Sequence, residues 1–144
     1  DTRKFKTFFA KVNFIRGKIT FLTVEYDIKE IYIEQSLQSF RSGFSSAKTL
    51  SALSRFNGAV SWLIFEHTGV TPEYISASSA RKSCGIKIPR GENAKQKVVE
   101  FLLDKEPCFV VEYTRFGNIK PECFDKADSI VIARAGYNCQ QKRN

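Results

Sequence analysis

Residues 30–35 read Glu30-Ile31-Tyr32-Ile33-Glu34-Gln35, a short run of β-branched and aromatic side chains that ends on a carboxylate and an amide. This composition predicts a β-strand. Alternate residues of a strand share a face, so we expect Tyr32 and Glu34 on one side and Ile31 and Ile33 on the other. Ligands of α/β proteins gather at the carboxyl ends of strands, which makes Glu34 a candidate functional acid. A charge at a strand end is also ordinary, and both interpretations stay open.

Helix and strand patterns alternate along the rest of the chain. Apolar residues recur every three or four positions over 5–24, 47–67, 94–105 and 122–135, which predicts helices. Further strands are predicted at 72–77 and 108–113. Asn93 and Pro121 suit the starts of the last two helices, and the helix over 47–67 runs through Asn57-Gly58. This alternation favours an α/β fold with a largely parallel sheet.

The composition narrows the classes of function. With 144 residues, of which 42% are hydrophobic and 26% charged, the chain predicts one folded domain. Lys and Arg number 23 against 15 acids, and the formal net charge of +8 suggests a polyanionic partner. No apolar run is long enough for a membrane span, so we expect no membrane partner.

The cysteines and the single histidine exclude several chemistries. Cys84, Cys108, Cys123 and Cys139 form no close pair, which argues against a zinc site and favours reduced thiols in an intracellular, cytoplasm-like compartment. His67 is the one histidine, so a Ser- or Cys-nucleophile mechanism has little choice of base. A histidine at a helix end is the plainer interpretation of His67. Any catalysis is therefore expected from carboxylates.

Two of these carboxylates stand three residues apart on the last predicted helix. Asp125 and Asp128 point the same way there, and their stripe continues through Ile132 and Ala135 as an apolar one. Like charges held together on an inward stripe repel, and Mg²⁺ would relieve that repulsion. Acids near a helix start also favour the helix dipole without any other function.

A basic stretch separates these acids from Glu34. It holds Arg81, Lys82, Lys87, Arg90, Lys95 and Lys97 against one acid, Glu92. Clustered cations bind nucleic acid through its phosphates with little base specificity, although such a stretch is also compatible with a solvated surface. Phe40 and Phe44, in the polar loop after Glu34, are suited either to base stacking or to packing on the core.

Several blocks in fixed order make the sequence more specific. They are Ile31-Tyr32-Ile33-Glu34-Gln35, Arg55-Phe56-Asn57-Gly58, Ser79-Ala80-Arg81-Lys82-Ser83-Cys84-Gly85, Asn93-Ala94-Lys95-Gln96-Lys97-Val98-Val99 and Asp125-Lys126-Ala127-Asp128-Ser129. In order and spacing, from about residue 10 to residue 136, the chain resembles a RuvC-type Holliday-junction resolvase of the viral and phage branch.

The resemblance implies an RNase H-like fold, with a mixed central sheet flanked by helices on both faces. It also implies a homodimer that resolves four-way (Holliday) DNA junctions by Mg²⁺-dependent phosphodiester hydrolysis, with Mn²⁺ able to substitute. Carried over by position, Glu34, Asp125 and Asp128 are metal-binding catalytic acids, and Lys95 is a catalytic lysine. The DNA contacts would be made by basic residues: Arg81, Lys82, Lys87, Arg90 and Lys95.

The family pattern opens with a strand that carries a further catalytic Asp. This sequence departs from the pattern there, because it shows no such strand. Asp1 is followed by charged residues and a helix pattern, and we do not assign it that role. We expect residues 1–144 to form a single nuclease domain that lacks the N-terminal β-hairpin region, because the lack of an initiator Met favours an opening strand outside these residues. Alone, these residues are then expected to be inactive. The alternatives are a non-catalytic branched-DNA-binding protein, and a nuclease of the same superfamily directed at RNA.

Overall fold

The computed structural model describes residues 4–35 and 47–141. Their contacts divide them into two compact units. The first comprises 4–31, 35 and 47–73, and the second comprises 32–34 and 74–141. The predicted loop at 39–46, with Phe40 and Phe44, lies outside the described residues.

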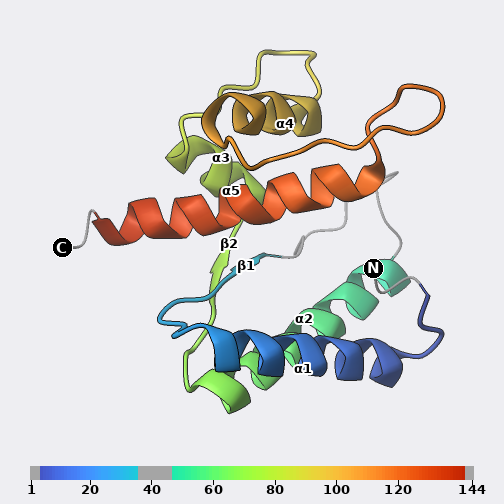
Figure 1. The fold of residues 1–144 in the computed structure, drawn as a ribbon, viewed down its shortest axis with the longest axis vertical. Coiled ribbons are helices and arrows are strands. Elements are labelled where there is room, and N and C mark those ends of the chain that lie inside the picture. Colours follow the sequence, from blue (N-terminus) through green and yellow to red (C-terminus); the bar gives the residue numbers. More distant parts are fainter. Residues whose placement is uncertain (1–3, 36–46, 142–144) are drawn as a thin grey trace. The chain divides into compact units, whose positions relative to one another are not determined.

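Two helices make up the first unit. Helix α1 spans Phe8–Glu25 and helix α2 spans Ala47–Thr68, close to the predicted ranges of 5–24 and 47–67. The two helices pack on each other (Figure 1), Ile19 and Leu63 are buried, and Phe8 makes an edge-on contact with Phe56, with ring centroids 6.1 Å apart. Helix α2 continues through Gly58, as the periodicity predicted.

The second unit is built around one long helix. Helix α5 spans Pro121–Gln141, and α3 (Ala77–Ser83), α4 (Ala94–Lys105) and strand β1 (Tyr32–Glu34) each pack against it (Figure 1). The buried core comes from α3, α4, the segment after α4, and α5: Ala80, Val98, Val99, Leu102, Phe109, Ala127, Val131, Ile132 and Ala135.

Local capping explains where the helices of this unit begin. The Asn93 side chain accepts hydrogen bonds from the backbone N–H groups of Lys95 and Gln96, at 2.9 and 3.4 Å, which confirms the predicted cap of α4. Pro121 opens α5, also as predicted, where its missing N–H has no helical partner to lose. Ser76 caps α3 by accepting from the Ser79 N–H.

The prediction of an RNase H-like fold is wrong for the described residues. Helices hold 63% of them, and they contain one small sheet of two parallel strands, β1 and β2 (Glu73–Ile75). A mixed central sheet with helices on both faces is therefore absent from residues 4–35 and 47–141. The predicted strand at 72–77 shortens to β2, because Ser76 caps a helix that begins at Ala77.

The segment 108–113 shows why a strand pattern did not become a strand. Phe109 is buried and Val111 packs against the core, while Val110 between them is 70% exposed, so the alternation of faces is present. The only β-pairing of this segment among the described residues is an isolated antiparallel bridge between Tyr113 and Ile119. The alternation is satisfied by packing on the helical core, and a hydrogen-bonded ladder needs an extended neighbour that this segment lacks over most of its length.

A close approach of backbone and ring holds β1 against α5. A Cβ built on Gly136 would overlap the Tyr32 ring, so only glycine leaves room for the ring at this point of α5. Gly136 is buried, and Tyr32 packs at the edge of the core.

We expect Gly136→Ala to destabilise the second unit by about 1–3 kcal/mol, because the ring or the helix must shift to admit the methyl group. Amide hydrogen exchange along α5 measures the effect within this unit. Gly58→Ala is the control: Gly58 also lies inside a helix, with open space where a Cβ would be, and this change should stabilise α2 by about 0.5–1 kcal/mol. In a Tyr32→Ala background the penalty of Gly136→Ala should largely disappear, and an unchanged penalty would contradict the proposed overlap.

Candidate active site

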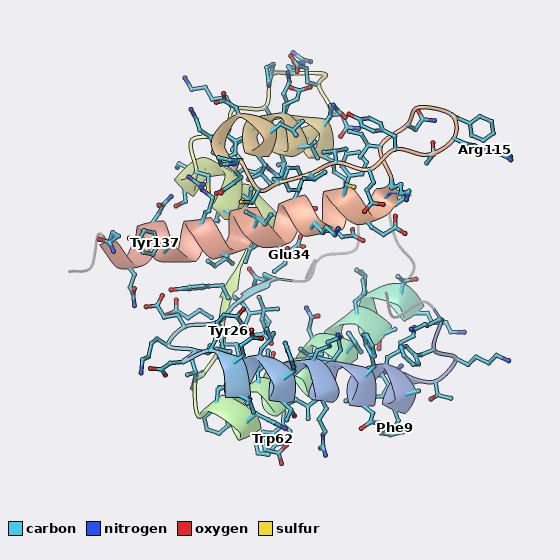
Figure 2. The ribbon with its side chains drawn as sticks, in the orientation of Figure 1. Phe9, Tyr26, Glu34, Trp62, Arg115 and Tyr137 are labelled. Atoms are coloured by element: carbon cyan, nitrogen blue, oxygen red, sulfur yellow. The ribbon has the colours of Figure 1, made fainter. Side chains whose placement is uncertain are left out.

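Glu34 reaches α5 because it shares a strand face with Tyr32. Two residues along a strand return to the same side, and Tyr32 packs on Gly136 of α5. Figure 2 shows Glu34 on the side of α5 where β1 lies. The side chain of Glu34 ends in partly solvated surroundings, since the residue as a whole is exposed.

Asp125 and Asp128 lie on α5, one turn apart. Ala127 and Val131 of the same helix are fully or almost fully buried, which fixes the rotation of α5 about its axis. That rotation leaves Asp128 partly buried and Asp125 exposed. The predicted pair therefore exists, and one of its carboxylates lies at the edge of the core.

The surroundings raise the pKa of Glu34 above its ordinary value. Desolvation by the surrounding protein is the largest cause, and the carboxylate of Asp128 is the next. Lys95 and Arg81 act in the opposite direction, and Asp125 raises the pKa a little further. These interactions place all five charged groups in one electrostatic neighbourhood within the second unit.

The same neighbours affect the pKa of Asp128. Its pKa is also raised, first by desolvation, while the positive charges of Lys95 and Arg81 lower it and Asp125 raises it. A carboxylate that loses solvent near another acid is held in an unfavourable ionised state. The cluster of Glu34, Asp125 and Asp128, which we call the carboxylate cluster, would therefore gain from a bound cation.

The two cations of this neighbourhood come from different helices. Lys95 lies in the first turn of α4, which the Asn93 cap positions. Arg81 lies on α3, directly after the buried Ala80, and α3 is tied to α5 by a hydrogen bond of 3.2 Å from the Asn138 amide to the Ser83 carbonyl oxygen. The sequence predicted Lys95 beside the acids. It predicted Arg81 as a DNA contact only, and no sequence signal placed it near Glu34.

The remaining predicted DNA contacts lie outside this neighbourhood. Lys82 is exposed on α3, and Lys87 and Arg90 are exposed between α3 and α4. Lys97, by contrast, forms ion pairs with Glu92 and Glu100 at 2.6 and 3.0 Å. The described basic stretch thus offers Lys82, Lys87 and Arg90 to solvent, while two acids neutralise Lys97.

The chemistry of the carboxylate cluster fits Mg²⁺, because hard oxygen ligands from a few carboxylates are what this ion takes in proteins. Its geometry is not that of an assembled metal site. Within residues 4–35 and 47–141, no group of three or more Asp, Glu, His or Cys side chains is arranged to hold a metal ion. Glu34, Asp125 and Asp128 are close enough to feel one another's charge, yet they would have to converge further to share one ion.

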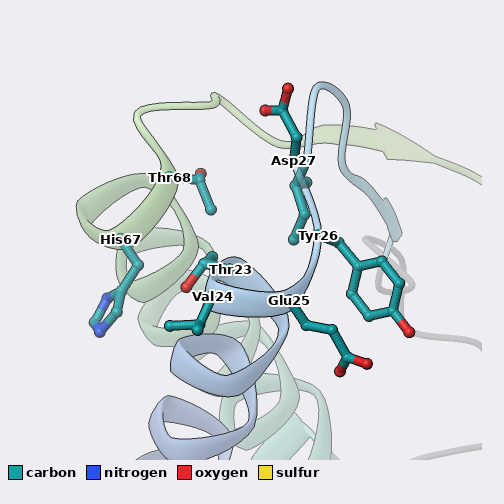
Figure 3. Close-up of a pocket in the computed structure, with 8 residues that line it drawn as sticks. Thr23, Val24, Glu25, Tyr26, Asp27, His67 and Thr68 are labelled. Atoms are coloured by element: carbon teal, nitrogen blue, oxygen red, sulfur yellow. The ribbon is translucent and has the colours of Figure 1, made fainter.

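Two hollows of the described surface contain none of the predicted catalytic residues. One, of about 370 Å³, lies in the first unit between the end of α1 and the end of α2 and includes Tyr26, Asp27 and His67 (Figure 3). His67 lies in the last turn of α2 with its Nδ1 atom 2.9 Å from the Leu63 carbonyl oxygen, as the plainer interpretation expected of a helix-end histidine. Another, of about 440 Å³, lies in the second unit beside Cys108 and Ile130.

No protein-family model, no curated protein and no solved structure matches this chain. The class of protein therefore has to be argued from the carboxylate cluster and its surroundings. Among the described helices, none is both long and apolar enough to cross a bilayer.

The raised pKa values predict how stability depends on pH. A carboxyl group whose pKa is higher in the folded state than in the unfolded state destabilises the fold once it ionises. Asp128→Asn should therefore leave stability nearly unchanged at pH 3 and become increasingly stabilising, relative to the unmodified protein, as pH rises above about 4. Urea unfolding at a series of pH values measures this difference.

The matched control is Asp104→Asn, which removes an exposed carboxylate from the end of α4, 2.9 Å from Lys105. We expect this variant to show no comparable gain with rising pH. Equal pH profiles for the two variants would show that the burial of Asp128 has no influence on its ionisation.

Proposed function

We propose that this protein is a Mg²⁺-dependent endonuclease that cuts branched DNA, with the four-way junction as its substrate. The observation that carries the proposal is the electrostatic neighbourhood of Glu34, Asp125, Asp128, Lys95 and Arg81, drawn from four separate elements. The proposal rests on this site and on the RuvC-type sequence blocks. It does not rest on the fold, because the described residues lack the mixed sheet of RNase H-like proteins.

Each residue of the neighbourhood has a role in such a reaction. Glu34, Asp125 and Asp128 would hold the metal, which supplies an activated water and stabilises charge on a phosphate. Lys95 lies near Glu34 and Asp128, the two carboxyl groups whose pKa values are raised. It would stabilise the negative charge that develops on the phosphate during attack. Arg81 is placed to position a phosphate, since its planar guanidinium group suits paired hydrogen bonds to phosphate oxygens.

The exposed cations of the basic stretch support a DNA substrate. Lys82, Lys87 and Arg90 are open to solvent, and the chain carries a formal net charge of +8. Phosphate contacts of this kind give affinity that falls with salt and carries little sequence information. We therefore propose that the protein recognises the shape of the DNA branch. We also propose that it does so as a homodimer, as the resemblance implies. A reducing intracellular compartment remains a prediction.

A non-catalytic branched-DNA-binding protein is the second candidate. The observation that favours it is the lack, among the described residues, of three ligands arranged around a common point. It predicts junction binding without cleavage, even by the full-length protein with Mg²⁺ or Mn²⁺.

Substitution of Asp128 separates the two candidates. We expect Asp128→Asn to abolish Mg²⁺-dependent cleavage of a four-way junction by the full-length protein while junction affinity changes by less than about threefold, because the carboxylate contacts metal rather than phosphate. Gel assays on four-way DNA, duplex DNA and an RNA–DNA hybrid measure cleavage and its selectivity. Asp104→Asn is again the control and should cleave normally. Full cleavage by Asp128→Asn would remove this residue from the reaction.

Metal binding can be tested without any cleavage. Mg²⁺ should raise the melting temperature of the unmodified protein, because a ligand that binds only the folded state stabilises it and a cation relieves the repulsion within the carboxylate cluster. Glu34→Gln and Asp128→Asn should each shrink this shift, and Asp104→Asn should not. A shift that is equal in all four proteins would place the metal elsewhere.

A further inference from the structure

The segment before α5 forms a closed loop that projects from the second unit. We call residues 112–120 the aromatic loop. An antiparallel bridge between Tyr113 and Ile119 closes its base, and beside that bridge the Lys120 ammonium group lies 2.7 Å from the Glu112 carboxylate. Figure 1 shows the loop extending past the first turn of α5.

Hydrogen bonds between residues within the loop hold it in one shape. The Thr114 N–H donates to the Asn118 carbonyl oxygen at 2.7 Å, and the Gly117 N–H donates to the Thr114 carbonyl oxygen at 3.0 Å. The Thr114 hydroxyl accepts from the N–H groups of Phe116 and Asn118, each at 3.3 Å. Gly117 has φ of 77°, a conformation that other residues rarely adopt. A loop fixed in this way loses little entropy when it binds a partner.

The tip of the loop presents flat groups to solvent. The Arg115 guanidinium carbon lies 4.5 Å from the centre of the Phe116 ring, and Phe116 is 74% exposed. Tyr113, at the base, is 58% exposed. Figure 2 shows Arg115 at the outer end of the loop. Among the described residues, no carboxylate forms an ion pair with Arg115, so its charge is available to a partner.

A nucleobase matches this surface better than an apolar side chain does. Bases stack on aromatic rings and on guanidinium planes, and the adjoining phosphate pairs with a cation. Paired bases of a duplex offer no free face, so an unpaired nucleotide is the form that fits. The loop also leads directly into the helix that carries two of the clustered acids. Pro121, which follows the loop, and Asp128 are seven residues apart on α5, about 10 Å, or roughly three base steps.

We propose that the aromatic loop binds an unpaired nucleotide, with the base stacked on Phe116 and a neighbouring phosphate paired with Arg115. The choice of DNA rests on the proposed function, in which the unpaired nucleotide belongs to a branch point held at the carboxylate cluster. The stacking itself requires no cleavage.

The test uses a single-stranded oligonucleotide that carries the fluorescent base 2-aminopurine, and a duplex of the same sequence, both in EDTA at low salt. We expect Phe116→Ala to weaken single-strand binding about tenfold and to abolish the fluorescence change of stacking. Duplex affinity should stay the same. The matched control is Phe9→Ala, which removes an equally exposed phenylalanine (79%) from α1 and should leave both affinities unchanged.

Arg115→Gln is the second variant and should also weaken single-strand binding, with a smaller dependence on salt. Circular dichroism checks that each variant folds, which is expected because both side chains lie at an exposed loop tip. Equal single-strand affinities for Phe116→Ala and Phe9→Ala would overturn the proposal. So would a Phe116→Ala protein that keeps its oligonucleotide affinity and loses binding to vesicles of phosphatidylserine and phosphatidylcholine, because the loop would then be a membrane contact.

The experiment distinguishes this inference from the proposed function. If the full-length protein never cleaves a junction but Phe116→Ala still loses single-strand binding, the endonuclease proposal fails and the role of the aromatic loop stands. If the protein cleaves and Phe116→Ala binds the oligonucleotide normally, the reverse holds.

Discussion

The Tyr32 ring occupies the space where a side chain at position 136 would lie, and the candidate site depends on this contact. It holds the short strand β1 on α5 through one glycine. Because Tyr32 and Glu34 share a face of that strand, the same contact brings Glu34 within electrostatic range of Asp128. Strand β1 is three residues long and pairs with β2, and the Tyr32 ring packs it against α5 as well.

The second feature of the site is that its cations compensate the negative charge of its acids only in part. Two carboxyl groups lose solvent near each other, and Lys95 and Arg81 offset only part of the penalty, since both pKa values remain raised. A divalent cation would stabilise the ionised form of both carboxyl groups, which is the physical basis of the proposed metal site.

Of the five described helices, α1, α2, α4 and α5 were predicted from the sequence, whereas α3 and the small extent of the sheet were not. Apolar periodicity, the Asn93 cap and Pro121 act over a few residues, and the structure has α4 at the predicted 94–105. Strand formation needs a partner from elsewhere in the chain. The alternation over 108–113 was satisfied by packing on the helical core and by one bridge, and the sheet has two strands among the described residues. The RNase H-like fold, which the family resemblance implied, is wrong for the described residues because their strand patterns do not join into one large sheet.

The candidate site, like the fold, could be predicted from the sequence only in part. The sequence by itself determined that Asp125 and Asp128 share a helix face and that Tyr32 and Glu34 share a strand face, because both follow from the period of one element. It also determined the basic character of the stretch that contains Arg81 and Lys95. Only the tertiary structure decided that these groups, from β1, α3, α4 and α5, act on one another, because their proximity depends on packing between elements distant along the chain. It also decided that the aromatic loop projects as a closed and exposed unit, since the bridge and the Thr114 hydrogen bonds that shape it have no signature in composition.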